Sequence, residues 1–214
     1  MGRNSGGSNP YNSTQAVIAV NTNGKKVSKA TQTHVQSTAE SLRNLKYRDT
    51  ERAIGSAIAR YEAVMGIRER NIKIADISGA YGVTFLNQNG SQMIYLSKSA
   101  FNVPKKQFEA RYKKDNYDTG FKNKTNRPVT HTITHELAHA TWTSHYTSPK
   151  HLAAGKEIQK LYKSWSKDKK KKDYGSYGKT NVDEFWAEVI TKGIHGKSDK
   201  YTKKAIGIAK KYKL

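Results

Sequence analysis

One five-residue motif constrains this chain more than any other feature, because residues 135–139 read His-Glu-Leu-Ala-His. In an α-helix, positions i and i+4 lie on one face, so His135 and His139 can direct two imidazoles at one metal ion. Glu136 lies beside His135 and can reach a water molecule held at that ion. Two nitrogen ligands and a carboxylate base are typical of a zinc hydrolase. The alternative is a chance match on an ordinary amphipathic helix, so support must come from elsewhere in the chain.

A third ligand is needed, because a catalytic zinc usually takes three protein ligands and keeps one position for water. The chain contains no cysteine, so this ligand must be a histidine or a carboxylate. Glu184 and Glu188 are spaced i,i+4 on one helical face, whereas Phe185 and Trp186 occupy the opposite face. Two carboxylates on a helix that also packs into a core favour a nearby positive charge, which the histidine-bound ion would supply. Solvated surface acids are the alternative, since glutamate is usually exposed.

Two segments of the chain form a pattern together: His-Glu-Leu-Ala-His-Ala at 135–140 and Tyr-Gly-Lys-Thr-Asn-Val-Asp-Glu-Phe-Trp-Ala-Glu at 177–188. This pair of segments resembles the catalytic domain of the anthrax lethal factor family of zinc metallopeptidases. In this gluzincin family, the histidine pair and a glutamate on a later helix bind zinc, and a tyrosine seven residues before that glutamate faces the metal. The resemblance spans residues 45–195. One departure is Ala138, where relatives usually have glycine, but alanine is small enough for the same place.

The resemblance implies a role for each matching residue. Glu184 is expected as the third zinc ligand, Tyr177 as the hydroxyl that faces the metal, and Glu188 as a carboxylate behind the ligands. With Glu136 as general base, the implied activity is that of a zinc-dependent endopeptidase acting on a protein or peptide substrate. The implied fold is α+β and zincin-like. Related domains also occur in phage-encoded proteins, and the small, lysine-rich character of this chain suits that origin.

Other residues near the motif compete for these roles. His131 lies four residues before His135 and shares its helical face, which makes it the serious rival ligand. Its expected place in the first helical turn favours a supporting or exposed role instead. Tyr174 could substitute for Tyr177, but its spacing to Glu184 does not match the family pattern.

Apolar periodicity predicts a helical chain with a small sheet. We expect a mostly antiparallel sheet over the His-Glu-x-x-His helix and the following Glu-bearing helix. Its third strand is expected at the edge, where residues 94–97 would hold an extended peptide. Pro128 should begin the metal-binding helix, with Thr125 or Asn126 as its cap. The predicted helices are 42–65 (ended by Gly66), 104–112, 128–143, 150–165, 182–193 and 201–212, and the predicted strands are 71–77, 81–86 and 92–97.

The net charge is extreme for 214 residues, because 39 lysines and arginines face 17 aspartates and glutamates, which gives +22. Such a charge implies attraction to polyanions, although no recognised nucleic-acid-binding motif is visible. An alternative function is therefore a basic, nucleic-acid-associated protein, such as a virion component, whose zincin domain is secondary or inactive. A structural zinc site is a further alternative, but it would need neither Glu136 nor Tyr177.

The chain divides by composition into three parts. Residues 1–40 are rich in Gly, Ser, Asn and Thr and predict a flexible polar arm, in which only 16–20 could form a strand. Residues 41–196 should form the metallopeptidase domain, and 197–214 a basic C-terminal helix or tail. No segment has the pattern of an export signal or the length of a membrane span, so a cytoplasmic or virion-associated protein is expected.

Overall fold

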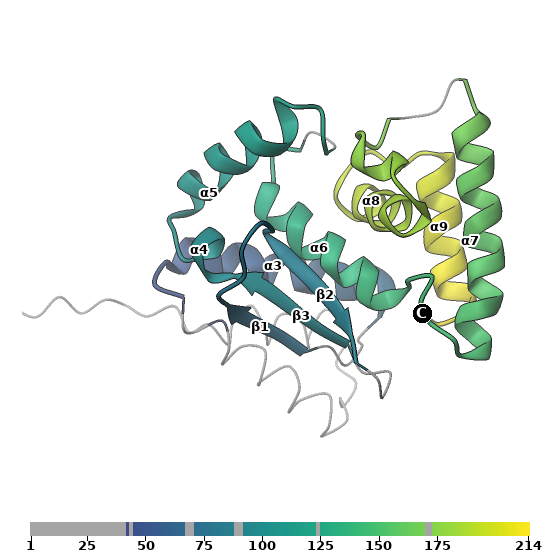
Figure 1. Cartoon of the computed structure of the whole chain (residues 1–214), viewed down its shortest axis with the longest axis horizontal. Coiled ribbons are helices and arrows are strands. Elements are labelled where there is room, and N and C mark those ends of the chain that lie inside the picture. The colour runs from purple at the N-terminus through teal and green to yellow at the C-terminus, as the bar shows by residue number, and fades with distance from the viewer. Residues whose placement is uncertain (1–41, 43–44, 67–70, 88–91, 123–124, 170–172) are drawn as a thin grey trace, which may run out of the picture.

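The computed structural model describes residues 42, 45–66, 71–87, 92–122, 125–169 and 173–214. The polar arm predicted at 1–40, including the possible strand at 16–20, lies outside this part of the chain. The described part is a mostly helical α+β structure with one small sheet, which confirms the predicted fold class at that level (Figure 1).

The elements follow the predicted order, with shifts of a few residues at their ends. The strands are β1 (Asn71–Ala75), β2 (Gly82–Leu86) and β3 (Gln92–Ser97). The α-helices are α3 (Arg48–Met65), α4 (Lys98–Phe101), α5 (Lys105–Tyr112), α6 (Pro128–Thr141), α7 (Pro149–Lys167), α8 (Val182–His195) and α9 (Lys200–Lys211). A π-helical turn, η1 (Lys113–Tyr117), extends α5, and a 3₁₀ turn, η2 (Tyr177–Lys179), precedes α8.

The sheet differs from the prediction in strand order and direction. Its order is β1-β3-β2, in which β3 is parallel to β1 and antiparallel to β2. The prediction of a mostly antiparallel sheet with the third strand at its edge is therefore wrong. Strand β3 carries the most apolar residues and buries Ile94 and Leu96, so it takes the central place with a neighbour on each side. The strand edge beside the candidate site belongs to β2.

Helix α6 is the centre of the molecule, because it contacts β2 and β3 on one side and α3 and α8 on others (Figure 1). The Tyr61 hydroxyl of α3 donates to the Leu137 carbonyl, and the Trp186 indole of α8 donates to the Ala138 carbonyl. Ala138 is completely buried beneath these contacts, in agreement with the need for a small residue there. The motif is thus fixed from both sides.

The start of α6 confirms the place of proline but not that of the cap. Pro128 is the first helical residue, where its missing N–H costs nothing. The residue that caps the helix by position is Arg127, and no side chain caps it, so the assignment of Thr125 or Asn126 is wrong. Thr125 instead accepts a hydrogen bond from the Arg127 N–H at 3.1 Å. Arg127 precedes the first helical residue, so this bond satisfies no N–H group of the helix itself.

The basic C-terminal segment forms α9, whose apolar face belongs to the same hydrophobic core as α7 and α8. Tyr201, Ala205 and Ile208 are buried there, and Asp199 caps the helix by accepting from the N–H groups of Tyr201 and Thr202. Its lysines lie on the outer side. Among the described helices, none has the combination of length and hydrophobicity that crossing a bilayer requires.

Candidate functional site

Three potential ligand atoms from α6 and α8 converge at one point. Nε2 of His135 lies 3.1 Å from Nε2 of His139 and 3.1 Å from Oε2 of Glu184, and the last two atoms are 3.3 Å apart. Atoms that bind one zinc ion tetrahedrally at about 2.0–2.1 Å are about 3.3 Å from each other. The spacing therefore fits three ligands of a single metal ion.

The charges around these atoms also fit a cation. Oε2 of Glu184 is buried and accepts no hydrogen bond, a costly state for a carboxylate oxygen. Burial acts to raise the pKa of Glu184, but the imidazoles of His135 and His139 hold it well below its usual value. Burial and Lys122 act to lower the pKa of His135, yet Glu184 and Glu188 raise it above the ordinary value. The site attracts positive charge.

A second carboxylate lies behind His135. Glu188 is completely buried, and both its oxygens lie 3.1 Å from Nε2 of His131, which is itself buried. Oε1 of Glu188 is also 3.1 Å from Nδ1 of His135, although without the straight geometry of a hydrogen bond. Burial acts to raise the pKa of Glu188, but His131 and His135 keep it well below its normal value. A carboxylate in this place can fix the orientation of the His135 ring.

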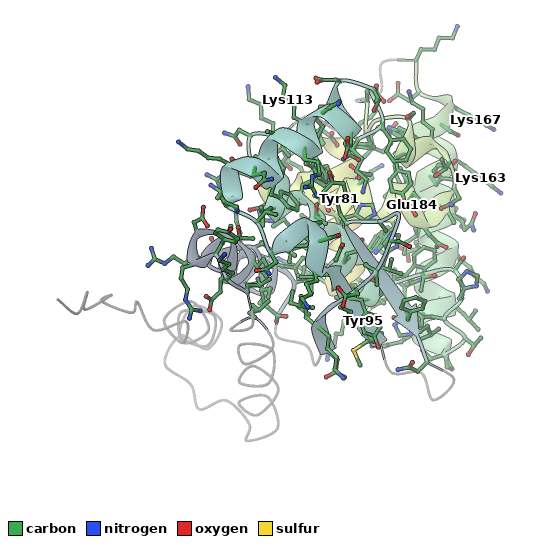
Figure 2. The ribbon with its side chains drawn as sticks, turned by 60° about the vertical axis from the view of Figure 1, so that its left-hand side comes forward. Tyr81, Tyr95, Lys113, Lys163, Lys167 and Glu184 are labelled. Carbon is green, nitrogen blue, oxygen red and sulfur yellow. The ribbon has the colours of Figure 1, made fainter. Side chains whose placement is uncertain are left out.

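Two overlapping groups in the described residues could therefore hold a metal ion. One consists of His131, His135 and Glu188 and is buried throughout, while the other consists of His135, His139 and Glu184 and is partly exposed. They share His135, which would use Nδ1 in the first group and Nε2 in the second. Glu184, labelled in Figure 2, and Glu188 both belong to helix α8.

The partly exposed group opens into a cavity of about 570 Å³, and Glu136 and Tyr177 line the same cavity. Strand β2 forms the facing wall. The Thr84 hydroxyl donates to Oε2 of Glu136 at 2.8 Å, which fixes the carboxylate against the strand. A Cβ atom on Gly82 would come within 2.8 Å of Cγ of Glu136, so only glycine leaves room for that side chain.

Tyr177 is held by the segment that precedes α6. Its backbone N–H donates to the Phe121 carbonyl at 2.8 Å, and Nζ of Lys122 lies 4.5 Å from the ring centroid. The ring lies nearly parallel to that of His135, with centroids 5.6 Å apart. Burial, and next the charge of Glu184, raise the pKa of Tyr177 far above its usual value. The hydroxyl is therefore a hydrogen-bond donor at neutral pH.

The structure brings the predicted residues His135, Glu136, His139, Tyr177 and Glu184 to one cavity, and places Glu188 and His131 behind them. An exposed role for His131 is excluded by its burial.

The rival Tyr174 lies elsewhere, because its hydroxyl donates to Asp199 in the core next to α9. Sequence reasoning missed Gly82 and Thr84. A glycine at the start of a strand signals the close approach of another group, and that signal was present at Gly82.

Comparison with known proteins finds no family model, no curated protein and no solved structure that matches the chain. The functional assignment therefore depends on the geometry of the site.

Proposed function

We propose that this chain is a zinc-dependent endopeptidase with a zincin-like fold, of the gluzincin type that its motifs resemble. The observation that carries the proposal is the convergence of His135, His139 and Glu184 at the wall of a cavity that also holds Glu136 and Tyr177. A structural metal site would need neither of the last two residues and would be closed on all sides.

The proposed zinc site is the partly exposed group of His135, His139 and Glu184, called the open group below, rather than the buried group that contains His131 and Glu188. A catalytic ion needs an open coordination position, and only the group with His139 and Glu184 faces the cavity with both Glu136 and Tyr177. The pair of His131 and Glu188 then acts as the support that fixes the ring of His135. When bound, zinc would polarise the substrate carbonyl and lower the pKa of a water molecule.

The chain's own residues would move the proton and stabilise the developing charge. Glu136, held by Thr84, accepts the proton of the attacking water and passes it to the leaving amine. The protonated Tyr177 hydroxyl donates to the carbonyl oxygen as that oxygen becomes negative.

The free edge of β2 supports a peptide as substrate. This strand pairs only with β3 in the described sheet, and its residues line the cavity beside Glu136. An extended chain segment can add to such an edge through backbone hydrogen bonds. Phe85 and Leu86 are 51% and 37% exposed and offer apolar contact to substrate side chains.

The test is cleavage of an unfolded protein, such as reduced casein, by the zinc-loaded chain. Glu136→Gln should retain zinc and lower turnover by about 10²–10⁴-fold, because the general base is lost. Lys106→Gln, an exposed substitution on α5 away from the cavity, serves as the control and should cleave at the wild-type rate. Full turnover by Glu136→Gln would contradict the proposal.

A further inference from the structure

Helix α7 carries a stripe of four lysines on its outer face. Lys156, Lys160, Lys163 and Lys167 are spaced four, three and four residues apart and are all exposed. This spacing places them on one side of an α-helix. The opposite side has the same spacing and is buried, through Ala154, Ile158, Leu161 and Trp165. Figure 2 shows Lys163 and Lys167 projecting outward from this helix.

Helix α9 supplies a second basic row beside the first. Lys200, Lys204 and Lys211 lie on one side of that helix. Gly207 lies on the same side, between Lys204 and Lys211. The groove between the helices has a volume of about 490 Å³ and is lined by Lys160, Lys204 and Lys211. A Cβ atom added to Gly207 would meet no atom within 4 Å, so the groove is open at this position.

Few carboxylates neutralise this surface. Glu157 is the one acidic residue that lines the groove, and Lys211 and the Tyr212 hydroxyl already bind it at 2.5 and 2.7 Å. Lys200 pairs with Asp168. In the described part of the chain, no carboxylate lies within ion-pair distance of the remaining lysines, which are Lys156, Lys160, Lys163, Lys167 and Lys204.

We propose that this α7–α9 lysine surface binds the phosphate backbone of nucleic acid without sequence preference. The α7 stripe covers eleven residue steps, or about 16 Å, which corresponds to about five base-pair steps of a duplex. Lysines supply point charges that attract phosphates but read no bases.

A membrane surface fits this face less well. A helix that lies in a bilayer interface presents a broad apolar face. Here the apolar residues of both helices are turned into the core. Leu152, one turn before Lys156, is the one large apolar side chain of α7 or α9 that is exposed. The surface is therefore suited to electrostatic contact.

The experiment measures binding of the full chain to a fluorescein-labelled 20-base-pair duplex by anisotropy, at salt concentrations from 50 to 200 mM. With four phosphate contacts, the wild-type affinity should fall about 100-fold over this range. Replacement of Lys156, Lys160, Lys163 and Lys167 by glutamine should remove most of that salt dependence, since each lysine–phosphate pair contributes about 0.9 to the log–log slope. Glutamine retains helix propensity, which circular dichroism can verify.

A matched control removes the same charge from the other end of the molecule. Lys98, Lys106, Lys113 and Lys114 are exposed on or beside α4 and α5, across the molecule from α7 and α9 (Figure 1). Their replacement by glutamine should change duplex affinity at 100 mM salt less than about threefold, against tenfold or more for the stripe variant. Equal losses in the two variants, or no duplex binding by the wild type, would overturn the proposal. Stripe-dependent binding to phosphatidylserine vesicles but not to the duplex would also overturn it.

Discussion

Two histidine–carboxylate groups share His135, and they differ in their access to solvent. The carboxylates come from one helix and are four residues apart, yet the side chain of Glu184 is 16% exposed and that of Glu188 is completely buried. One turn of α8 therefore separates a carboxylate at an open cavity from one inside the core. Both oxygens of Glu188 have a partner in His131, whereas Oε2 of Glu184 accepts no hydrogen bond.

This difference in exposure indicates that the buried group stabilises the fold, whereas the open group is suited to bind a cation. In the buried group, Glu188 and His131 satisfy each other, so this pair is suited to hold α6 and α8 together and to fix the ring of His135 from behind. The open group has an unsatisfied oxygen beside two imidazoles, so it gains from a cation. Identical residue types thus take different roles because of what covers them.

The largest expected effect comes from removing each carboxylate in turn. Glu188→Ala leaves His131 buried without its charge partner and should lower the free energy of unfolding by about 3–5 kcal/mol, measured by urea in the presence of a chelator. Glu184→Ala should cost less, about 1–2 kcal/mol under the same conditions, because its contacts with His135 and His139 lie at the partly exposed cavity, where water can replace the carboxylate. Equal losses in the two variants would remove the distinction between the groups.

A smaller effect is expected where β2 meets the open group. Gly82→Ala should displace Glu136 and lower turnover by about 10–100-fold while zinc is retained, because the carboxylate proposed as general base is misplaced. Gly207→Ala makes the same chemical change on α9 in open space and should leave peptidase activity unaltered. Unchanged turnover in Gly82→Ala would show that contact with β2 does not position the base.

The smallest effect concerns His195, the last residue of α8. Its ring is hydrogen-bonded to the Thr134 hydroxyl of α6 at 2.6 Å. Burial, and next the charge of Arg60, lower the pKa of His195 from 6.5 to about 3. The unfolded chain therefore binds a proton at a higher pH than the folded chain does. This contribution to stability is complete above pH 6.5 and is lost as the pH falls from there toward 3.

Urea unfolding at pH 7.0 and 4.5 measures this loss. His195→Gln can keep the bond to Thr134 but cannot titrate, so the loss of stability between the two pH values should be smaller by about 1–2 kcal/mol than in the wild type. An identical loss in both proteins would show that His195 is not kept neutral by its surroundings.

Sequence reasoning reached those parts of the site that depend on local geometry. The spacing of His135 to His139, and of Glu184 to Glu188, determines shared helical faces once the helices form. Glycine at 66 and proline at 128 marked helix ends correctly. The burial of Trp186 and Phe185 likewise followed from their place on α8.

What sequence reasoning missed depends on contacts between distant segments. Thr84 and Glu136 are 52 residues apart, and no local pattern brings them together. The order of the strands was wrong because alternation identifies a strand but not its neighbours. For His131, the first-turn position left a supporting role and an exposed role open, and the packing of α8 against α6, which buries it, excludes the exposed one.

The central claim is that zinc binds the open group of His135, His139 and Glu184. Zinc stoichiometry of His139→Gln and His131→Gln tests it most directly, because each substitution alters one group while His135 remains. The wild type should bind one zinc per chain, His139→Gln should lose it, and His131→Gln should keep it with affinity reduced by about 10–100-fold. Retention of zinc by His139→Gln together with its loss from His131→Gln would contradict the claim and place the ion in the buried group.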